Sequence, residues 1–364
     1  GMGKVTKALE DGVNVLIWCF AHFHPTSRSE SSLTDTRQTV YSRRIRIKSS
    51  QNLNNFRKYK ESLRDTGYGD VIHLVAFGGW NGPHLPPGYT ANELYDAFRE
   101  FNMDEDTSET TQNNDGVEKT DGYHFLFDGI DWDLEGHDNV KSPTNEFTKE
   151  CLDQMGGFSA LAKKNGMIVS MAPPESYLDI TTHGFSRFVN LTYPEPWHQD
   201  FEYHGRNVYA YVLAKWADAI DFVFIQFYES YSHAAYQIAN RGMDPSLFLC
   251  EYNLQLETQG GGLTVNFEDD PSLCLKTQHV ALPFDKLVFG FANGWALNAD
   301  IGDKTIFFDS FCVKVAYRKL LLVGRQPRGL GFWVVEEEGK HGIEYAKDLN
   351  EILDFERLAK TEAF

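Results

Sequence analysis

Residues 127–136 constrain this chain more than any other stretch, because they read Phe-Asp-Gly-Ile-Asp-Trp-Asp-Leu-Glu-Gly. Successive side chains of a β-strand point to opposite faces, so three carboxylates share one face and three large apolar side chains share the other. The carboxylates belong to Asp131, Asp133 and Glu135, and the apolar side chains to Ile130, Trp132 and Leu134. Neighbouring acids on that face lie about 6.5 Å apart at their Cα atoms. Because such acids repel one another and lose hydration, a purely structural role explains them poorly.

Three interpretations of this acidic face compete: a solvated edge strand, a Mg²⁺ or Ca²⁺ site, and an array for acid/base chemistry. A solvated edge strand is disfavoured because the large apolar side chains of this stretch mark a strand that is buried on at least one side; they are Phe125, Phe127, Ile130, Trp132 and Leu134. Ca²⁺ loops place their acids and a glycine at fixed offsets in a turn, whereas these acids lie on a strand. In an acid/base array, crowding raises the pKa of one carboxyl so that it can donate a proton at neutral pH. The pattern therefore favours catalysis by carboxyl groups, with no metal and no cofactor.

The acidic segment resembles a known family. Its form Asp-Gly-x-Asp-x-Asp-x-Glu, residues 128–135, is similar to the D-G-x-D-x-D-x-E signature of glycoside hydrolase family 18, the chitinases. Other predicted strand ends add matching segments: Ala76-Phe77-Gly78-Gly79-Trp80, Met171-Ala172-Pro173-Pro174, Gln226-Phe227-Tyr228-Glu229 and Phe332-Trp333. Each of these segments alone is also typical of an ordinary core. Their order along roughly residues 10–350 supports the resemblance.

The resemblance implies an endo-chitinase-like enzyme that hydrolyses β-1,4-linked N-acetylglucosamine polymers by a retaining, substrate-assisted mechanism. Glu135 would be the general acid, and the N-acetyl carbonyl of the sugar would be the nucleophile. Asp133 would hold the acetamido N–H, and Tyr228 would bond the acetamido carbonyl. Asp131 would share a proton with Asp133, so that the two carboxyls titrate as a unit.

The resemblance also places residues at the substrate. These are Gln226, Glu229, Trp333, Met171, Gly79 and Trp80. Gln226 would position the sugar, and Trp333 would form the floor of a sugar-binding subsite. Glu229 stands where the family usually has Asn or Asp, and it would bond a sugar hydroxyl. Ala76 departs from the family, which has a serine there to support the first inward aspartate. We therefore expect weaker charge stabilisation on Asp131. Asp128 is expected to be structural, because it lies three residues from Asp131 and faces the other way.

Two alternatives share the motif. An endo-β-N-acetylglucosaminidase that acts on N-glycans has the same signature and mechanism, and the sequence does not separate it from a chitinase. A non-hydrolytic, lectin-like protein that binds chitin oligosaccharides is the other alternative. Such lectins typically lose the acid, whereas Glu135 is present.

Composition agrees with one large domain, residues 3–364, since 42% of 364 residues are hydrophobic. The net charge of −18 disfavours nucleic acid and anionic membranes as partners and is compatible with a neutral polysaccharide. We expect a monomer. No signal peptide or transmembrane stretch is visible, and the family resemblance favours secretion. The number of cysteines is five, and an odd number disfavours a full disulfide framework, although Cys250 and Cys274 could pair.

Apolar runs that alternate with helical segments predict an α/β fold, and the resemblance specifies a (β/α)₈ TIM barrel. The expected strands are Val13–Phe23, Val71–Gly79, His124–Glu135, Met167–Ala172, Asp221–Tyr228, Lys286–Phe291 and Leu330–Val335. The expected helices include Asn145–Lys164, Asn207–Ala217 and Phe308–Val323. Residues 102–122 read as a polar surface loop. The short connection after Phe291 predicts that the α+β insertion of some relatives is absent and that the cleft is shallow.

Seven strands are one fewer than the barrel needs. One interpretation places the first strand before this chain, so that Val13–Phe23 is strand two and residues 4–11 end the first helix. The alternative takes Val13–Phe23 as strand one and Thr39–Lys48 as strand two. The first is favoured, because residues 43–48, Arg-Arg-Ile-Arg-Ile-Lys, are too basic for a buried parallel strand.

Overall fold

The computed structural model describes residues 2–26, 44–103, 125–137, 139, 141–189, 207–229, 232–257, 261–298 and 306–361. Its centre is an eight-stranded sheet with the strand order β10-β9-β6-β5-β4-β3-β1-β2. The strands are β1 Val15–Thr26, β2 Arg44–Ser49, β3 Ile72–Gly79, β4 Gly129–Leu134, β5 Ile168–Met171, β6 Phe222–Gln226, β9 Leu287–Ala292 and β10 Gly329–Trp333. All neighbours pair in parallel except β1 and β2. A separate antiparallel pair joins β7 Leu263–Val265 to β8 Gln278–Val280.

The predicted α/β fold on parallel strands is confirmed, and each of the seven predicted strands is present within a few residues. The largest difference concerns β4, which begins at Gly129 rather than at position 124. The side chain of Asn102 hydrogen-bonds both backbone polar groups of Phe127. Asn102 Oδ1 accepts from the Phe127 N–H at 2.7 Å, and Asn102 Nδ2 donates to the Phe127 carbonyl at 2.9 Å. Phe127 is therefore bonded to the end of a helix instead of a neighbouring strand.

The basic segment forms strand β2, but not as a second parallel strand of the barrel. It runs antiparallel to β1, with Ala21 opposite Ser49 and Thr26 opposite Arg44, while β1 also pairs directly with β3. The alternative that placed Thr39–Lys48 as strand two is therefore wrong. Within β2, Ile45 is buried whereas Arg46 and Lys48 are exposed. An edge strand with one wet face tolerates these charges, which a buried parallel strand does not.

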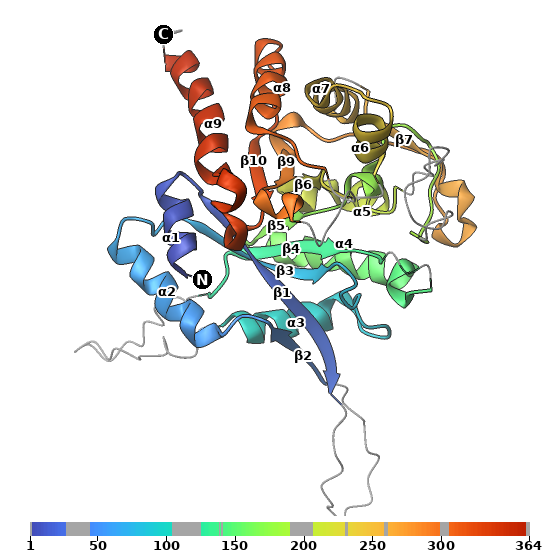
Figure 1. Cartoon of the computed structure of the whole chain (residues 1–364). Helices are drawn as coiled ribbons and strands as arrows, with labels where there is room; N and C mark the ends of the chain where they lie inside the picture. The colour runs from blue at the N-terminus through green and yellow to red at the C-terminus, as the bar shows by residue number, and fades with distance from the viewer. Residues whose placement is uncertain are drawn as a thin grey trace, which may run out of the picture.

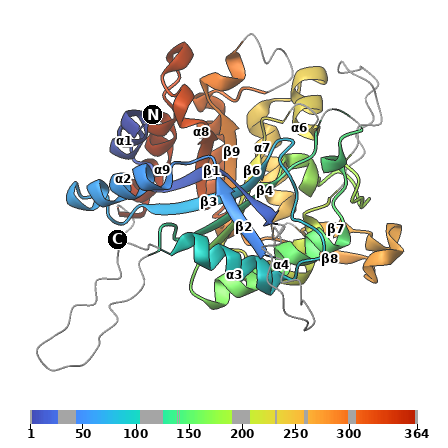
Figure 2. The ribbon, with the colours of Figure 1, turned by 90° about the horizontal axis from the view of Figure 1, so that it is seen from below.

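Helices cover the sheet from outside (Figure 1). They are α1 Met2–Glu10, α2 Leu53–Asp65, α3 Ala91–Asn102, α4 Lys149–Lys164, α5 Ala210–Trp216, α6 His233–Ala235, α7 Pro245–Leu256, α8 Ser310–Leu322 and α9 Tyr345–Thr361. Contacts link α3 to α4, α4 to α5, α7 to α8, α8 to α9 and α9 to α1. Seen from below, β2 lies beside α3, which it contacts (Figure 2). Most of the outer layer thus follows chain order, as βα units around a parallel sheet require.

Strands β10 and β1 end the parallel run, and no ladder between them is present among the described pairings. The two strands still approach each other, because the ring of Phe20 in the middle of β1 stacks on that of Trp333, the last residue of β10, with centroids 6.1 Å apart. Outside this junction, α1 contacts α9, and the hydroxyls of Thr6 on α1 and Tyr59 on α2 lie 3.2 Å apart. The prediction that residues 4–11 end a helix agrees with α1, and no described residue before β1 is in a strand.

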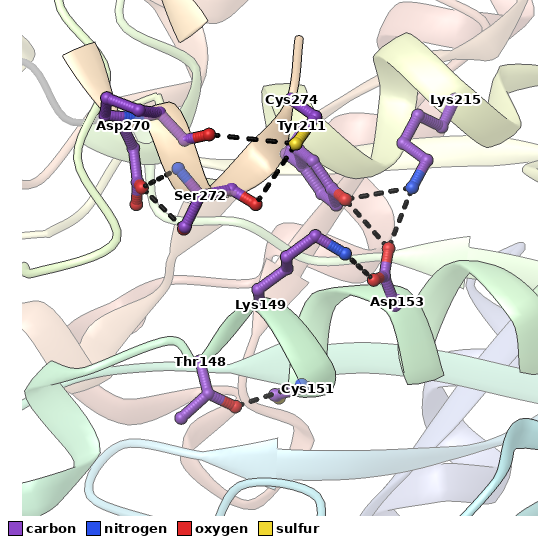
Figure 3. A network of polar contacts seen from close by, with 10 residues as sticks. Thr148, Lys149, Cys151, Asp153, Tyr211, Lys215, Asp270, Ser272 and Cys274 are labelled. Carbon is purple, nitrogen blue, oxygen red and sulfur yellow. Dashed lines mark hydrogen bonds and ion pairs between the residues drawn. The ribbon is translucent and has the colours of Figure 1, made fainter. Parts of the chain in front are cut away.

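An ion-pair network joins α4 to α5 in the outer layer (Figure 3). Asp153 accepts hydrogen bonds from Lys149 at 2.5 Å, from Tyr211 at 2.8 Å and from Lys215 at 2.8 Å. A hollow of about 390 Å³ opens beside it, lined by Tyr89, Thr90, Ala91, Lys149, Glu150, Asp153 and Gln154. None of these residues belongs to the predicted site, so the network is a helix-to-helix contact.

Several smaller predictions can be compared with this structure. The five cysteines are free, so the Cys250–Cys274 pairing is wrong: Cys250 is buried against the Ala316 carbonyl, whereas Cys274 is exposed. Residues 293–309 link β9 to α8, a connection too short for an inserted domain. Nearly all of the predicted 102–122 loop lies outside the described residues. Among the helices that are described, none is long and apolar enough to cross a bilayer.

Candidate active site

Strand β4 has the two faces that its alternating sequence predicts. Trp132 points to the helical layer, where its Nε1 donates to Ser159 Oγ of α4 at 2.8 Å. The acids point the other way, towards β5 and β6, and all three are buried, with exposed fractions of 1% for Asp131, 7% for Asp133 and 6% for Glu135. The inner face of the sheet therefore holds three carboxyl groups, those of Asp131 and Asp133 on β4 and that of Glu135 directly after it.

Asp131 lies deepest of the three and is supported from β5. Ser170 is its register partner on that strand, and the Ser170 hydroxyl donates to Asp131 Oδ1 at 2.5 Å. On the other side its register partner is Ala76 of β3, which offers no hydrogen bond. Burial raises the pKa of Asp131 to about 7, against the hydrogen bond from Ser170, which favours the ionised form.

Asp133 connects the acids to β6. Its Oδ1 accepts from Gln226 Nε2 at 2.7 Å, and its carboxyl also hydrogen-bonds the side chain of Glu135. Burial, followed by the charge of Asp131, raises the pKa of Asp133 well above its usual range, while the bonds from Glu135 and Gln226 act in the opposite direction. Ionised carboxylates have no donor, so a hydrogen bond between two of them requires that one carries a proton. The Asp133–Glu135 pair is thus arranged to hold and pass a proton.

Two glycines allow the backbone around the acids to pack closely. Gly129, the glycine of the acid motif, faces β5 so closely that a Cβ there would lie 1.8 Å from the carbonyl oxygen of Ile168. Gly79 ends β3 with a φ of +87°, and a Cβ there would lie 2.6 Å from the ring of Phe20. Only glycine combines that backbone conformation with that contact. Gly79 thus acts through its backbone and through the room it leaves for Phe20.

Aromatic side chains surround the acids at the carboxyl ends of β6, β9 and β10. Tyr228 is buried, lies edge-on to Trp295 at 6.1 Å between centroids, and packs in one cluster with half-buried Trp333. Burial raises the pKa of the Tyr228 phenol well above its usual range, and the charge of Asp133 acts in the same direction. The phenol therefore stays protonated and can donate a hydrogen bond beside Asp133.

The remaining predicted residues lie in three different settings. Trp80 follows the end of β3 and is 58% exposed. Its ring stacks on that of His137, with centroids 4.4 Å apart, which holds the ring in place at the surface. Glu229 is half-buried, and its charge contributes to the raised pKa values of Asp133 and Tyr228, which places it near both. Asp128 accepts the backbone N–H of His73 at 2.7 Å, a structural contact outside the acid cluster, as predicted.

The prediction for Met171 is wrong. Met171 is the register partner of Trp132, so the two side chains share the face of the sheet that turns to the helices. It has no exposed surface and belongs to the main hydrophobic core. Ser170, one residue earlier, occupies the interior face instead.

Sequence reasoning missed three residues that the structure brings to the acids or the aromatic cluster. These are Ser170, Trp295 and Phe20. Ser170 was detectable as the lone polar residue inside the apolar run of residues 167–172. Its partner was not, because the pairing register between β4 and β5 decides it. Among the residues that the structure describes, no three His, Cys, Asp or Glu side chains are placed to hold one metal ion.

Stability should depend on pH through Asp131. Its pKa of about 7 in the folded protein lies above the ordinary value of 3.8, so the folded state keeps a proton that the unfolded chain releases. This contribution is complete below about pH 4 and is lost as the pH rises through 7. We expect Asp131 to contribute a fall on the order of 3–4 kcal/mol in the free energy of unfolding over that range, and Asp131→Asn to remove this part. The raised pKa of Asp133 acts in the same direction, so the variant keeps a smaller fall of its own. Urea titrations at a series of pH values measure it.

Asp153→Asn is the matched control for this measurement. Although burial disfavours its charge, the hydrogen bonds from Lys149, Lys215 and Tyr211 hold the pKa of Asp153 below its usual range. Its contribution is therefore present above about pH 4 and is lost on acidification, opposite in sign to that of Asp131. Equal pH dependence in wild type and Asp131→Asn would contradict the prediction.

Comparison with known proteins finds similarity in solved structures alone: no family model matches the sequence, and no curated protein does. One similar structure is a GH18 chitinase from Pseudoalteromonas aurantia, 13% identical, with a TM-score of 0.46 and coverage of 96% of both chains. A fungal endo-β-N-acetylglucosaminidase of glycosyl hydrolase family 18 is 11% identical, with a TM-score of 0.44 and coverage of 93% of this chain and 87% of that chain. A Group IV chitinase of Ostrinia furnacalis is 11% identical, with a TM-score of 0.45 and coverage of 94% and 91%. The likeness concerns the fold alone.

Proposed function

We propose that this protein is a glycoside hydrolase that cleaves β-1,4-linked N-acetylglucosamine polymers by a retaining, substrate-assisted mechanism. One observation carries the proposal: Asp131 and Asp133 on the inner face of β4 and Glu135 directly after the strand are all buried, and Asp133 hydrogen-bonds Glu135. Neither a solvated strand nor ordinary core packing explains three buried carboxyls in a row. A site that holds a proton and delivers it to one bond explains this arrangement.

In the proposed reaction Glu135 protonates the glycosidic oxygen. The carbonyl oxygen of the substrate's N-acetyl group attacks the anomeric carbon, the bond to the leaving sugar breaks, and an oxazolinium ion forms. Water then opens this ring on the same face, with Glu135 taking the proton, so the β configuration is retained. The nucleophile belongs to the substrate, which fits a site that needs only one acid at the scissile bond.

The neighbours of Glu135 suit the remaining roles. Asp133 would accept the acetamido N–H and stabilise the positive charge that develops on the ring. Tyr228, which keeps its phenol proton, would donate to the acetamido carbonyl and hold it for attack. Asp131 would share a proton with Asp133 as that side chain turns towards the substrate.

The surrounding residues suit a chain of sugars. Trp333 and Trp295 present aromatic surface beside Tyr228, and exposed Trp80 offers a further ring at the rim. Gln226 uses its Nε2 on Asp133 and on the Ala172 carbonyl at 2.5 Å, so it would position the acid as well as the sugar. Glu229 would bond a sugar hydroxyl. Chitin oligosaccharides are the proposed substrates, with action on N-glycan cores as the second candidate.

A side-by-side assay tests the proposal. Purified protein is incubated with chitin hexamer, a high-mannose glycoprotein and cellohexaose, and products are separated by mass. We expect cleavage of the chitin hexamer and none of cellohexaose, because glucose has no acetamido group to act as nucleophile.

The outcomes separate the alternatives. Release of glycan from the glycoprotein with chitin left intact would favour the endo-β-N-acetylglucosaminidase. Binding of the chitin hexamer without cleavage, measured by calorimetry, would favour a lectin-like protein. Cleavage of cellohexaose would overturn the mechanism.

A further inference from the structure

Asp131 needs a hydrogen-bond donor that the family resemblance does not provide. Its carboxyl is 1% exposed, and its neighbour across β3 is the methyl group of Ala76, where the family has a serine. A buried carboxyl without a donor favours its protonated form and stops releasing its proton at neutral pH. The proposed reaction requires Asp131 to exchange a proton with Asp133.

Ser170 reaches Asp131 from the opposite side. It lies on β5 in register with Asp131, has no exposed surface, and places Oγ 2.5 Å from Asp131 Oδ1. The same hydroxyl lies 3.4 Å from the carbonyl oxygen of Ile130. The Ser170 hydroxyl therefore has two possible acceptors, the nearby carboxylate of Asp131 and the more distant carbonyl of Ile130.

This geometry suits both protonation states of Asp131. When the carboxyl is ionised, the serine hydroxyl donates to it. When the carboxyl is protonated, its O–H can donate to Ser170 Oγ while the serine hydrogen turns to the Ile130 carbonyl. A hydroxyl is able to reverse its direction in this way, whereas an N–H donor is not.

We propose that Ser170 is the positioning residue that keeps Asp131 able to gain and lose a proton, supplying from β5 the hydroxyl that position 76 of β3 lacks. The proposal rests on the proposed function for its effect on catalysis. Its effect on the titration of Asp131 holds independently of any activity.

Other groups that act on Asp131 must be considered with Ser170. Asp133 faces it from the same strand, and the charge of Asp131 is also felt by Cys19 of β1 and by Tyr209 before α5. Ala76 contributes none from β3. Ser170 donates a hydrogen bond to Asp131, and this bond stabilises the ionised carboxylate. Its removal should therefore raise the pKa of Asp131.

The test compares three variants. Ser170→Ala removes the hydroxyl, and Ser170→Thr keeps it. Ser159→Ala removes a matched buried hydroxyl of α4 that packs against the outer face of β4. This hydroxyl accepts from Trp132 Nε1 and donates to the Met155 carbonyl, and it is not bonded to an acid. The pKa of Asp131 is read by ¹³C NMR of protein labelled at aspartate carboxyls, with Asp131→Asn to assign the signal. The pH profile of kcat/KM on chitin hexamer is measured in parallel.

We expect Ser170→Ala to raise the pKa of Asp131 by about one unit, and the acidic limb of the profile to move upward with it. The threonine variant should restore both, and Ser159→Ala should leave both at their wild-type positions. An unchanged Asp131 titration in Ser170→Ala, or an equal shift in Ser159→Ala, would overturn the proposal. If the wild type cleaves no substrate, the proposed function fails, while the NMR titration still decides the role of Ser170.

Discussion

Glu135→Gln is expected to lower turnover of chitin oligomers by about 10²–10⁴-fold or more while leaving their binding nearly unchanged. General acid catalysis by a positioned group contributes a factor of that size, and an unprotonated sugar alkoxide is a very poor leaving group. Glutamine keeps the size of the side chain and loses the proton that the reaction uses. Initial rates from product separation, with binding measured by calorimetry, check both parts.

The matched control is Glu146→Gln. That carboxylate follows the same strand but is 49% exposed and pairs with Arg187 at 3.6 Å, outside the acid cluster. We expect it to keep wild-type turnover. If wild type and Glu135→Gln are equally inert and both bind chitin hexamer, the protein is a binding module.

Cleavage should require an N-acetyl group on the sugar at the non-reducing side of the broken bond. Only an acetamido oxygen reaches the anomeric carbon and closes a five-membered ring, so fully deacetylated chitosan should be resistant. Asp133→Ala and Tyr228→Phe should each lower kcat more than they raise KM, because they orient a group whose charge appears in the transition state. Losses of about 10²–10³-fold are expected for such donors and acceptors.

An NMR time course on chitin hexamer, with fresh product anomers resolved, is the decisive measurement. Retention predicts initial release of the β-anomer, and a thiazoline analogue of the ring intermediate should inhibit competitively. Tyr211→Phe is the control for the tyrosine variant, because its hydroxyl bonds Asp153 between α4 and α5, away from the acids. Initial release of the α-anomer would exclude this mechanism.

The acid cluster illustrates how far local sequence can reach. Alternation along residues 129–135 was enough to place Trp132 on one face and the carboxyls on the other, because a strand has a fixed period of two. The prediction for Met171 was wrong because it rested on where the motif lies along the chain and did not consider to which face of the sheet the side chain points. Ser170 and Met171 are adjacent in sequence, and the register with β4 assigns Ser170 to the interior and Met171 to the core.

The periodicity of apolar and charged residues within single segments was sufficient to predict the parallel α/β class, seven of the strands and the shared face of Asp131, Asp133 and Glu135. Other features depend on contacts between segments and were visible only in the folded chain. The fold turns the basic segment 44–49 back along β1 as an edge strand and stacks Phe20 on Trp333 between the two ends of the parallel run. It also places the hydroxyl of Ser170, and none from position 76, in a hydrogen bond with Asp131. Each of these contacts joins residues tens to hundreds of positions apart, so it depends on strand order and register, which local patterns do not encode.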